Sequence, residues 1–175
     1  MGASEAPGPA AAEASGAQPR PRVLVCVDGG SPARLLATAV PLLPRGVRWV
    51  ALHVIDVRGR AELEWLRHGL PGAGPLPPHL RAAIEEAGRE RAQTVLAAAG
   101  EVFRQHGIQP DPSQVRVGEP GREICGVAAA WPAELVVLGA SRQPRPEPGP
   151  KSVGRTARFV VDHAPCPVLL IRSRG

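Results

Sequence analysis

Short runs of Val, Leu and Ile recur along the chain, and segments with apolar residues at every third or fourth position separate them. The runs predict strands buried on both faces, whereas the three-to-four spacing predicts amphipathic helices. We expect strands at residues 23–27, 47–55, 113–117, 135–139 and Val168–Ile171.

Four helices are expected between these strands, at about residues 32–43, 78–106, 120–131 and 154–164. Ser31 before Pro32 predicts an N-cap followed by a first-turn proline. Pro41 should end or kink the first helix, and Gly107 should end the second. The apolar stripe expected on the second helix consists of Leu80, Ile84, Ala87, Val95, Ala98 and Val102.

Strands and helices alternate, which predicts an α/β fold with parallel strands and helices on both faces. The expected form is a doubly wound five-stranded parallel sheet in the order 3-2-1-4-5. In that order the direction of winding reverses between the first and fourth strands. The turn at residues 28–31 and the loop at 139–153 should then flank one crevice, although they are far apart in sequence.

The domain is expected to cover residues 21–175. Residues 1–20 are rich in Ala, Gly and Pro and have little to bury, which predicts a disordered tail. Residues 57–77 are long for a loop of a small α/β domain, so they indicate an insertion. It could serve as a lid or a partner surface, or be a tolerated insertion without a role.

Composition argues against nucleic acid as a partner. The chain has two Phe, three Trp and no Tyr, too few aromatic side chains for a base-stacking surface. The net charge is +5, and Lys151 is the single lysine among 21 basic residues. Such a bias towards Arg, together with much Ala, Gly and Pro, is typical of a GC-rich genome, so the basicity is weak support for polyanion binding.

Three cysteines, Cys26, Cys125 and Cys166, are odd in number and widely spaced. We interpret them as buried free thiols, which fits a reducing cytoplasm. No apolar run approaches the roughly 18 residues that a membrane span needs, and no signal-peptide pattern is present near the N-terminus. His53 and His163 are interpreted as structural because neither has a partner at metal-ligand spacing.

The loop at 139–153 precedes a helix N-terminus, where an anion would bind. Arg142, Arg145, Lys151 and Arg155 supply positive charge, and Ser152, Gly154 and Thr156 supply donors. Alternating prolines at 144, 146, 148 and 150 lack N–H groups and favour an extended, stiff segment. The loop either holds an anion with charges in place of backbone donors or is simply solvated.

Four stretches of the chain resemble the universal stress proteins. They are VLVCVDGG at residues 23–30, ALHVID at 51–56, VGEPGREICGVAAAWPAELVVLGAS at 117–141, and DHAPCPVLLIR at 162–172. The resemblance implies a fold like that of the adenine nucleotide α-hydrolases, a cytoplasmic location, and a homodimer through the edge strand Val168–Ile171. One branch of that family binds ATP in the crevice and another does not.

The ATP-binding branch has a phosphate motif of spaced glycines followed by a hydroxyl residue. Here Gly139 matches its first glycine, Arg142 replaces the second, and Gly154 is the best match for the third, two residues late. Arg155 occupies the hydroxyl position, with Thr156 next. The candidate nucleotide-binding residues implied or suggested in this way are Asp28, Val54, Gly139, Arg142, Lys151, Ser152, Gly154, Arg155 and Thr156.

The resemblance leaves three functions open. In the first, the protein is a dimeric stress-response regulator or adaptor for an unidentified protein, with an altered nucleotide crevice and no enzymatic turnover. In the second, it is a switch that binds ATP, with Mg²⁺ only as the companion of ATP. In the third, it is a small nucleotide hydrolase or transferase, which the lack of a nucleophile–base pair disfavours, so that no catalytic residue is expected.

Overall fold

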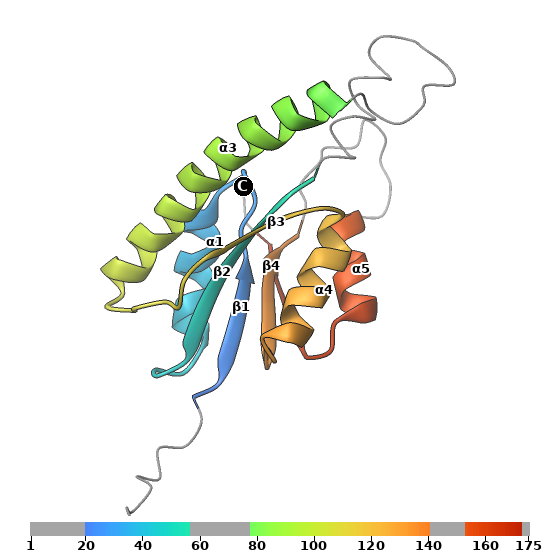
Figure 1. The fold of residues 1–175 in the computed structure, drawn as a ribbon. Helices are drawn as coiled ribbons and strands as arrows, with labels where there is room; N and C mark the ends of the chain where they lie inside the picture. Colours follow the sequence, from blue (N-terminus) through green and yellow to red (C-terminus); the bar gives the residue numbers. More distant parts are fainter. Residues whose placement is uncertain (1–19, 57–77, 141–152, 173–175) are drawn as a thin grey trace, which may run out of the picture.

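The computed structural model describes residues 20–56, 78–140 and 153–172. The predicted tail, apart from Arg20, and the predicted insertion at 57–77 lie outside this range. The elements in chain order are β1 (Arg22–Cys26), α1 (Pro32–Ala39), a 3₁₀ turn (Val40–Leu42), β2 (Arg48–Ile55), α3 (Pro78–Gln105), β3 (Gln114–Val117), α4 (Pro120–Ala130), β4 (Leu135–Gly139), α5 (Arg155–His163) and β5 (Val168–Ile171) (Figure 1).

The five strands form one parallel sheet in the order β3-β2-β1-β4-β5, which confirms the predicted topology. β1 is the central strand, and Leu24 lies in register with Val50 of β2 and Val136 of β4. Strands β1 and β4 are more than a hundred residues apart in the chain, yet they are neighbours in the sheet. This pairing sets the winding reversal next to β1, as expected.

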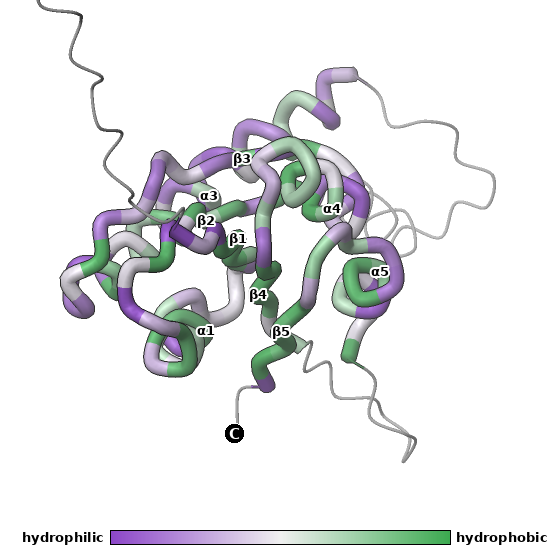
Figure 2. Tube along the Cα trace, turned by 90° about the horizontal axis from the view of Figure 1, so that it is seen from below, coloured by the Kyte–Doolittle hydropathy of each residue, from purple (hydrophilic) through white to green (hydrophobic). Residues whose placement is uncertain are grey.

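Two apolar clusters cover the two faces of the sheet, because side chains alternate in direction along each strand. On one face α1 and α3 pack over Val23, Val25 and Trp49. On the other, α4 and α5 pack over Leu24, Val50 and Val136. Figure 2 shows the two helix pairs on opposite sides of the strands. All these strand residues are buried, so the apolar runs read from the sequence are strands covered on both faces.

The first helix ends as its proline predicts. α1 stops at Ala39, and Pro41 lies in the 3₁₀ turn that follows. Ser31 occupies the N-cap position and Pro32 the first turn, but the Ser31 side chain makes no cap hydrogen bond. The predicted N-cap position of Ser31 is therefore confirmed, but capping by its side chain was wrong. The Ser31 carbonyl accepts a hydrogen bond from the Leu35 N–H at 3.1 Å.

Helix α3 ends at a glycine with a left-handed backbone. Gly107 has φ +66°. The Ile108 N–H donates to the Phe103 carbonyl at 2.8 Å, and the Gly107 N–H donates to that of Arg104 at 3.0 Å. Backbone donors beyond the last turn thus satisfy its free carbonyls. This ending requires a positive φ, which glycine adopts without steric strain.

The buried stripe of α3 differs from the predicted one. Ala87 is exposed, whereas its neighbour Gly88 is buried. A β-carbon at Gly88 would lie 2.5 Å from Ile55 Cγ2, so the helix approaches β2 closely at this point. Further along the helix, the buried residues are Ala92, Val95, Ala99, Val102 and Phe103.

Candidate functional site

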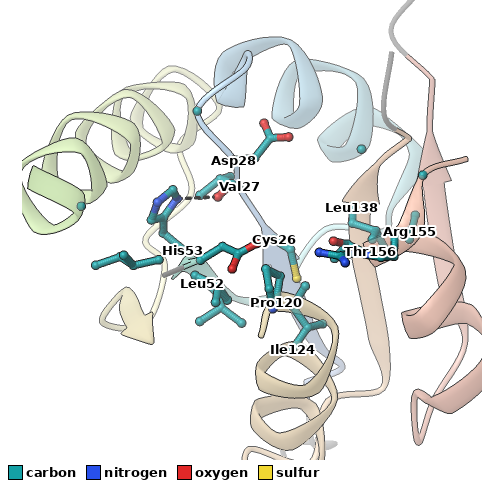
Figure 3. A pocket seen from close by; sticks show the side chains of 18 of the residues that line it. Cys26, Val27, Asp28, Leu52, His53, Pro120, Ile124, Leu138, Arg155 and Thr156 are labelled. Carbon is teal, nitrogen blue, oxygen red and sulfur yellow. Dashed lines mark hydrogen bonds between the residues drawn. The ribbon is translucent and has the colours of Figure 1, made fainter. Parts of the chain in front are cut away.

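A cavity of about 660 Å³ opens where β1, β2 and β4 end (Figure 3). Asp28 after β1 and Gly139 at the end of β4 both line it. The two turns that the sequence predicted to face one crevice therefore do so. The volume is within the range of small-molecule sites in proteins.

Six of the candidate residues line this cavity, namely Asp28, Val54, Gly139, Gly154, Arg155 and Thr156. They come from four separate parts of the chain: the turn after β1, β2, the end of β4 and the start of α5. The other candidates, Arg142, Lys151 and Ser152, lie outside the described residues. Their placement together is observed for the six, and binding of a nucleotide by any of them stays a prediction.

Asp28 shapes the turn in which it lies. Its Oδ1 accepts a hydrogen bond from the Gly30 N–H at 2.9 Å, as an aspartate before glycine commonly does. Within the described part of the chain, no hydrogen bond or ion pair to Oδ2 is found. The two interpretations of Asp28, turn residue and ligand contact, are thus compatible, because Asp28 lines the cavity and only one of its oxygens serves the turn.

His53 is structural, as predicted from the sequence, but it also forms part of the cavity wall. Its side chain is buried, and Nδ1 lies 2.8 Å from the Val27 carbonyl (Figure 3). A carbonyl only accepts, so Nδ1 carries the proton of this bond. The bond joins the ends of β1 and β2 beside the Asp28 turn and so supports the position of Asp28.

The start of α5 contributes backbone donors to the cavity. Gly154 is the N-cap residue, with φ +95° and ψ 156°, a conformation that favours glycine. Arg155 and Thr156 form the first turn, and both line the cavity. The free N–H groups of a first turn and the positive end of the helix dipole attract an anion. Gly154, the match for the third glycine of the motif, therefore lies at a position whose positive φ favours glycine.

Part of the cavity wall is apolar. Leu52, Ile124 and Leu138 are buried there, and Val54 is half-buried beside them. Ile124 reaches the cavity from α4, which covers the same sheet face as α5. A flat apolar group such as a nucleobase would lose water against this wall.

Sequence reasoning missed the contributions of α3 and α4. Gly88 and Arg91 of α3 line the cavity, as do Pro120 and Ile124 of α4. Gly88 and Arg91 are three residues apart, which puts them on one side of a helix. That spacing could have identified Arg91, had the close approach of Gly88 to β2 been visible in the sequence.

The cysteines are free, as predicted, but each is half-buried instead of fully buried. Cys26 lines the cavity, which explains its remaining exposure. Burial raises the pKa of the Cys26 thiol, and the neighbouring Cys125 raises it further. Burial also raises the pKa of Cys125 and of Cys166. All three thiols therefore stay protonated near neutral pH.

The raised pKa values of these thiols predict that the free energy of unfolding falls in alkaline solution. In the unfolded chain they deprotonate near 9.0, whereas the folded chain keeps their protons to higher pH. Above pH 9 the unfolded state binds fewer protons, so the free energy of unfolding falls as pH rises, by up to about 1.4 kcal/mol per pH unit for one thiol. The chain has no Tyr and a single Lys, so few other groups titrate there.

Urea unfolding under reducing conditions between pH 7 and pH 10 measures this slope. Cys26→Ala should flatten it, whatever constant loss of stability the smaller side chain causes. An unchanged slope in Cys26→Ala would contradict the assignment to this thiol.

Among the described residues, no group of three or more His, Cys, Asp and Glu side chains could hold a metal ion. None of the helices in the same ranges is long and apolar enough to cross a membrane.

The sequence profile of the universal stress protein family matches residues 19–172. Universal stress protein Sll1388 of Synechocystis sp. is 40% identical over 58 residues, which are 33% of this chain and 36% of that protein. The match thus spans about a third of the length of this curated relative.

Solved structures are similar over nearly the whole chain. Universal stress protein UspA from Lactobacillus plantarum is 26% identical, with a TM-score of 0.58 over 88% of this chain and 99% of that one. The universal stress protein from Archaeoglobus fulgidus in complex with dAMP is 23% identical, with a TM-score of 0.52 over 87% of this chain and 97% of that one. The latter likeness concerns the fold alone.

Proposed function

The chain belongs to the universal stress protein family, and on that premise we propose that it is a stress-response regulator that binds an adenine nucleotide in the cavity at the ends of β1, β2 and β4. The observation that carries the proposal is the meeting of Asp28 and Gly139 in one cavity, with an apolar wall and a helix N-terminus at its sides. The Archaeoglobus fulgidus relative, which was solved with dAMP, agrees with a ligand of this class.

The cavity suits the three parts of a nucleotide. The base packs against the apolar wall of Leu52, Val54 and Ile124. The ribose lies at the Asp28 turn, where the carboxylate accepts a hydrogen bond from a hydroxyl. The 5′-phosphate lies at Gly154–Thr156, where the first turn of α5 offers N–H groups and the positive end of its dipole.

We further propose that the site prefers a mono- or diphosphate to ATP. The segment between Gly139 and Gly154 contains prolines at 144, 146, 148 and 150, which have no N–H to donate. Arg142 replaces the second glycine of the ATP motif. Backbone donors for a long phosphate chain are therefore few, whereas the start of α5 suffices for one or two phosphates.

Regulation without turnover is the form of action that we propose. The histidine in the cavity wall, His53, uses Nδ1 to hold the Val27 carbonyl and is 7% exposed. Asp28 is partly occupied by its own turn. Neither group is set up as a base for a neighbouring nucleophile. A protein of this kind would act by contact with another protein, in the cytoplasm, where its three free thiols would stay reduced.

We infer a homodimer through β5. This strand is at one edge of the sheet and pairs with β4 on its other side. Val168, Leu169 and Leu170 along it are only half-buried, and an edge strand with apolar side chains favours pairing with a second chain. Light scattering at micromolar protein should give the mass of a dimer; the mass of a monomer would remove this inference.

Calorimetric titration with AMP, ADP and ATP, with and without Mg²⁺, tests nucleotide binding. AMP and ADP should bind, and Asp28→Ala should weaken both by about tenfold, because one charge-assisted hydrogen bond to the ribose is lost. Asp162→Ala, which removes an exposed carboxylate of α5 outside the cavity, should leave affinity unchanged. Failure of the wild-type chain to bind any of the three would overturn the proposed ligand.

A nucleotide switch is the second candidate, and the first-turn N–H groups of Arg155 and Thr156, which line the cavity, favour it. In that case ATP with Mg²⁺ would bind more tightly than AMP, and ATP at a hundred times its Kd would stabilise the fold by about 2.7 kcal/mol. Thermal unfolding without a shift at millimolar ATP would exclude the switch.

A further inference from the structure

Arg91 of α3 rests on the turn that follows β1. Its Nε lies 3.0 Å, and its Cζ 3.5 Å, from the point that a β-carbon on Gly29 would occupy. Gly29 does not have the left-handed φ that requires a glycine. A side chain at position 29 would therefore crowd the Arg91 guanidinium in its present position at the cavity, which both residues line.

No carboxylate of the described residues forms an ion pair with Arg91. The other arginines of α3 pair with glutamates of the same helix, Arg81 and Arg89 with Glu85, and Arg104 with Glu101. Within the described ranges, Arg91 makes neither an ion pair nor a hydrogen bond. Arg91 is exposed and lines the cavity, so its guanidinium is suited to an anionic ligand group there.

Arg91 and Arg155 reach the cavity from opposite sides of the sheet. α3 packs on the face that α1 also covers, and α5 packs on the other. In Figure 3, Arg155 lies across the cavity from His53, and α3 lies on the His53 side. The Asp28 turn follows β1, which lies between β2 and β4. The site thus has two cationic regions with a carboxylate between them.

The ribose of a nucleotide carries substituents in three directions: the base, the 5′-phosphate, and the 2′ and 3′ hydroxyls. The apolar wall accounts for the first direction and the start of α5 for the second. The third direction then leads to Asp28 and Arg91. A carboxylate accepts from a free hydroxyl, whereas a guanidinium is the group that binds phosphate.

We propose that the cavity takes an adenine nucleotide with a second phosphate on the ribose, separate from the 5′-phosphate, and that Arg91 binds this second phosphate. The unmodified hydroxyl donates to Asp28. Arg91 is then a specificity-determining residue that separates such a bisphosphate from AMP. This inference rests on the proposed function, since it adds one anionic group to the same nucleotide.

Calorimetric titration of the full chain with AMP, ADP and the two isomers of adenosine bisphosphate, 3′,5′ and 2′,5′, tests the inference. ADP is the matched ligand, because it has the same two phosphates on one chain. At least one ribose bisphosphate should bind about tenfold more tightly than AMP. Arg91→Gln should abolish that gain and change AMP and ADP affinity less than threefold.

Arg89→Gln is the control variant, since it removes the same charge from the same helix at a side chain paired with Glu85 and Glu86. It should keep the tenfold gain, and thermal unfolding should give both variants the wild-type midpoint. Bisphosphates no tighter than AMP, or a gain that survives Arg91→Gln, would overturn the inference while nucleotide binding stands. Loss of all binding in the wild-type chain would instead overturn the proposed function.

Discussion

Phe103→Ala is expected to lower the free energy of unfolding by about 3 to 5 kcal/mol. Phe103 is 1% exposed and is among the largest side chains that the fold buries completely. Its ring lies 5.6 Å from that of Trp49, in a tilted arrangement that favours aromatic pairs. Truncation would leave a cavity between α3 and the sheet that the surrounding residues cannot fill.

Urea unfolding followed by circular dichroism measures this loss, and the thermal midpoint should drop by about 10 °C. Val161→Ala is the control, because Val161 on α5 is 49% exposed and its truncation should cost less than about 0.5 kcal/mol. A loss of 1 kcal/mol or less for Phe103→Ala would mean that α3 does not pack on the sheet as described.

Gly88→Ala should destabilise the fold by about 2 kcal/mol, although alanine is the better helix former. The new β-carbon would lie 2.5 Å from Ile55 Cγ2 and 3.3 Å from two more Ile55 carbons. Ile55 is 5% exposed and β-branched, so it has little freedom to move aside. Helix α3 would have to shift away from β2, and the cavity wall beside Arg91 would shift with it.

Gly100→Ala, on the same helix, gives the opposite sign. A β-carbon there would meet nothing within 4 Å, so the gain in helix propensity of about 0.5 to 1 kcal/mol should appear in full. Urea midpoints of the two variants decide between packing and propensity. Stabilisation by both substitutions would contradict the close approach at Gly88.

The topology could be predicted because its signals are local. The apolar run around Leu24 and Val25 is too short for a helix and too continuous for a half-exposed strand, and Pro41 and Gly107 interrupt helices by covalent geometry alone. Alternation of such elements leaves few arrangements, and right-handed connections select among them. The positions of Asp28 and Gly139 then follow from the strand order.

The packing of α3 could not be predicted, because its signal is not local. Ala87 and Gly88 are both small and adjacent, and what decides between them is Ile55, which lies on a strand more than thirty residues earlier. Arg91 could not be predicted for the same reason, because its place at the cavity depends on its contact with Gly29, which is distant in sequence. Cys26 was expected to be fully buried, since nothing in its apolar run indicates that the strand end borders a cavity.

The motif residues were the easier part of the site. Val54, Gly154 and Thr156 could be assigned by matching positions, and they line the cavity. Comparison with the family motif identifies only residues within that motif. Helices α3 and α4 carry none of them, so they were absent from the predicted site.

The central place of β1 has a consequence for synthesis on the ribosome. One wall of the cavity, with Asp28, is translated early, but its counterpart at Gly139 and Gly154 emerges only when most of the polypeptide has been made. A nascent or truncated chain that stops before β4 therefore lacks the side of the cavity that Gly139 and the start of α5 form. Occupancy by a nucleotide would report that translation and folding of nearly the entire polypeptide are complete.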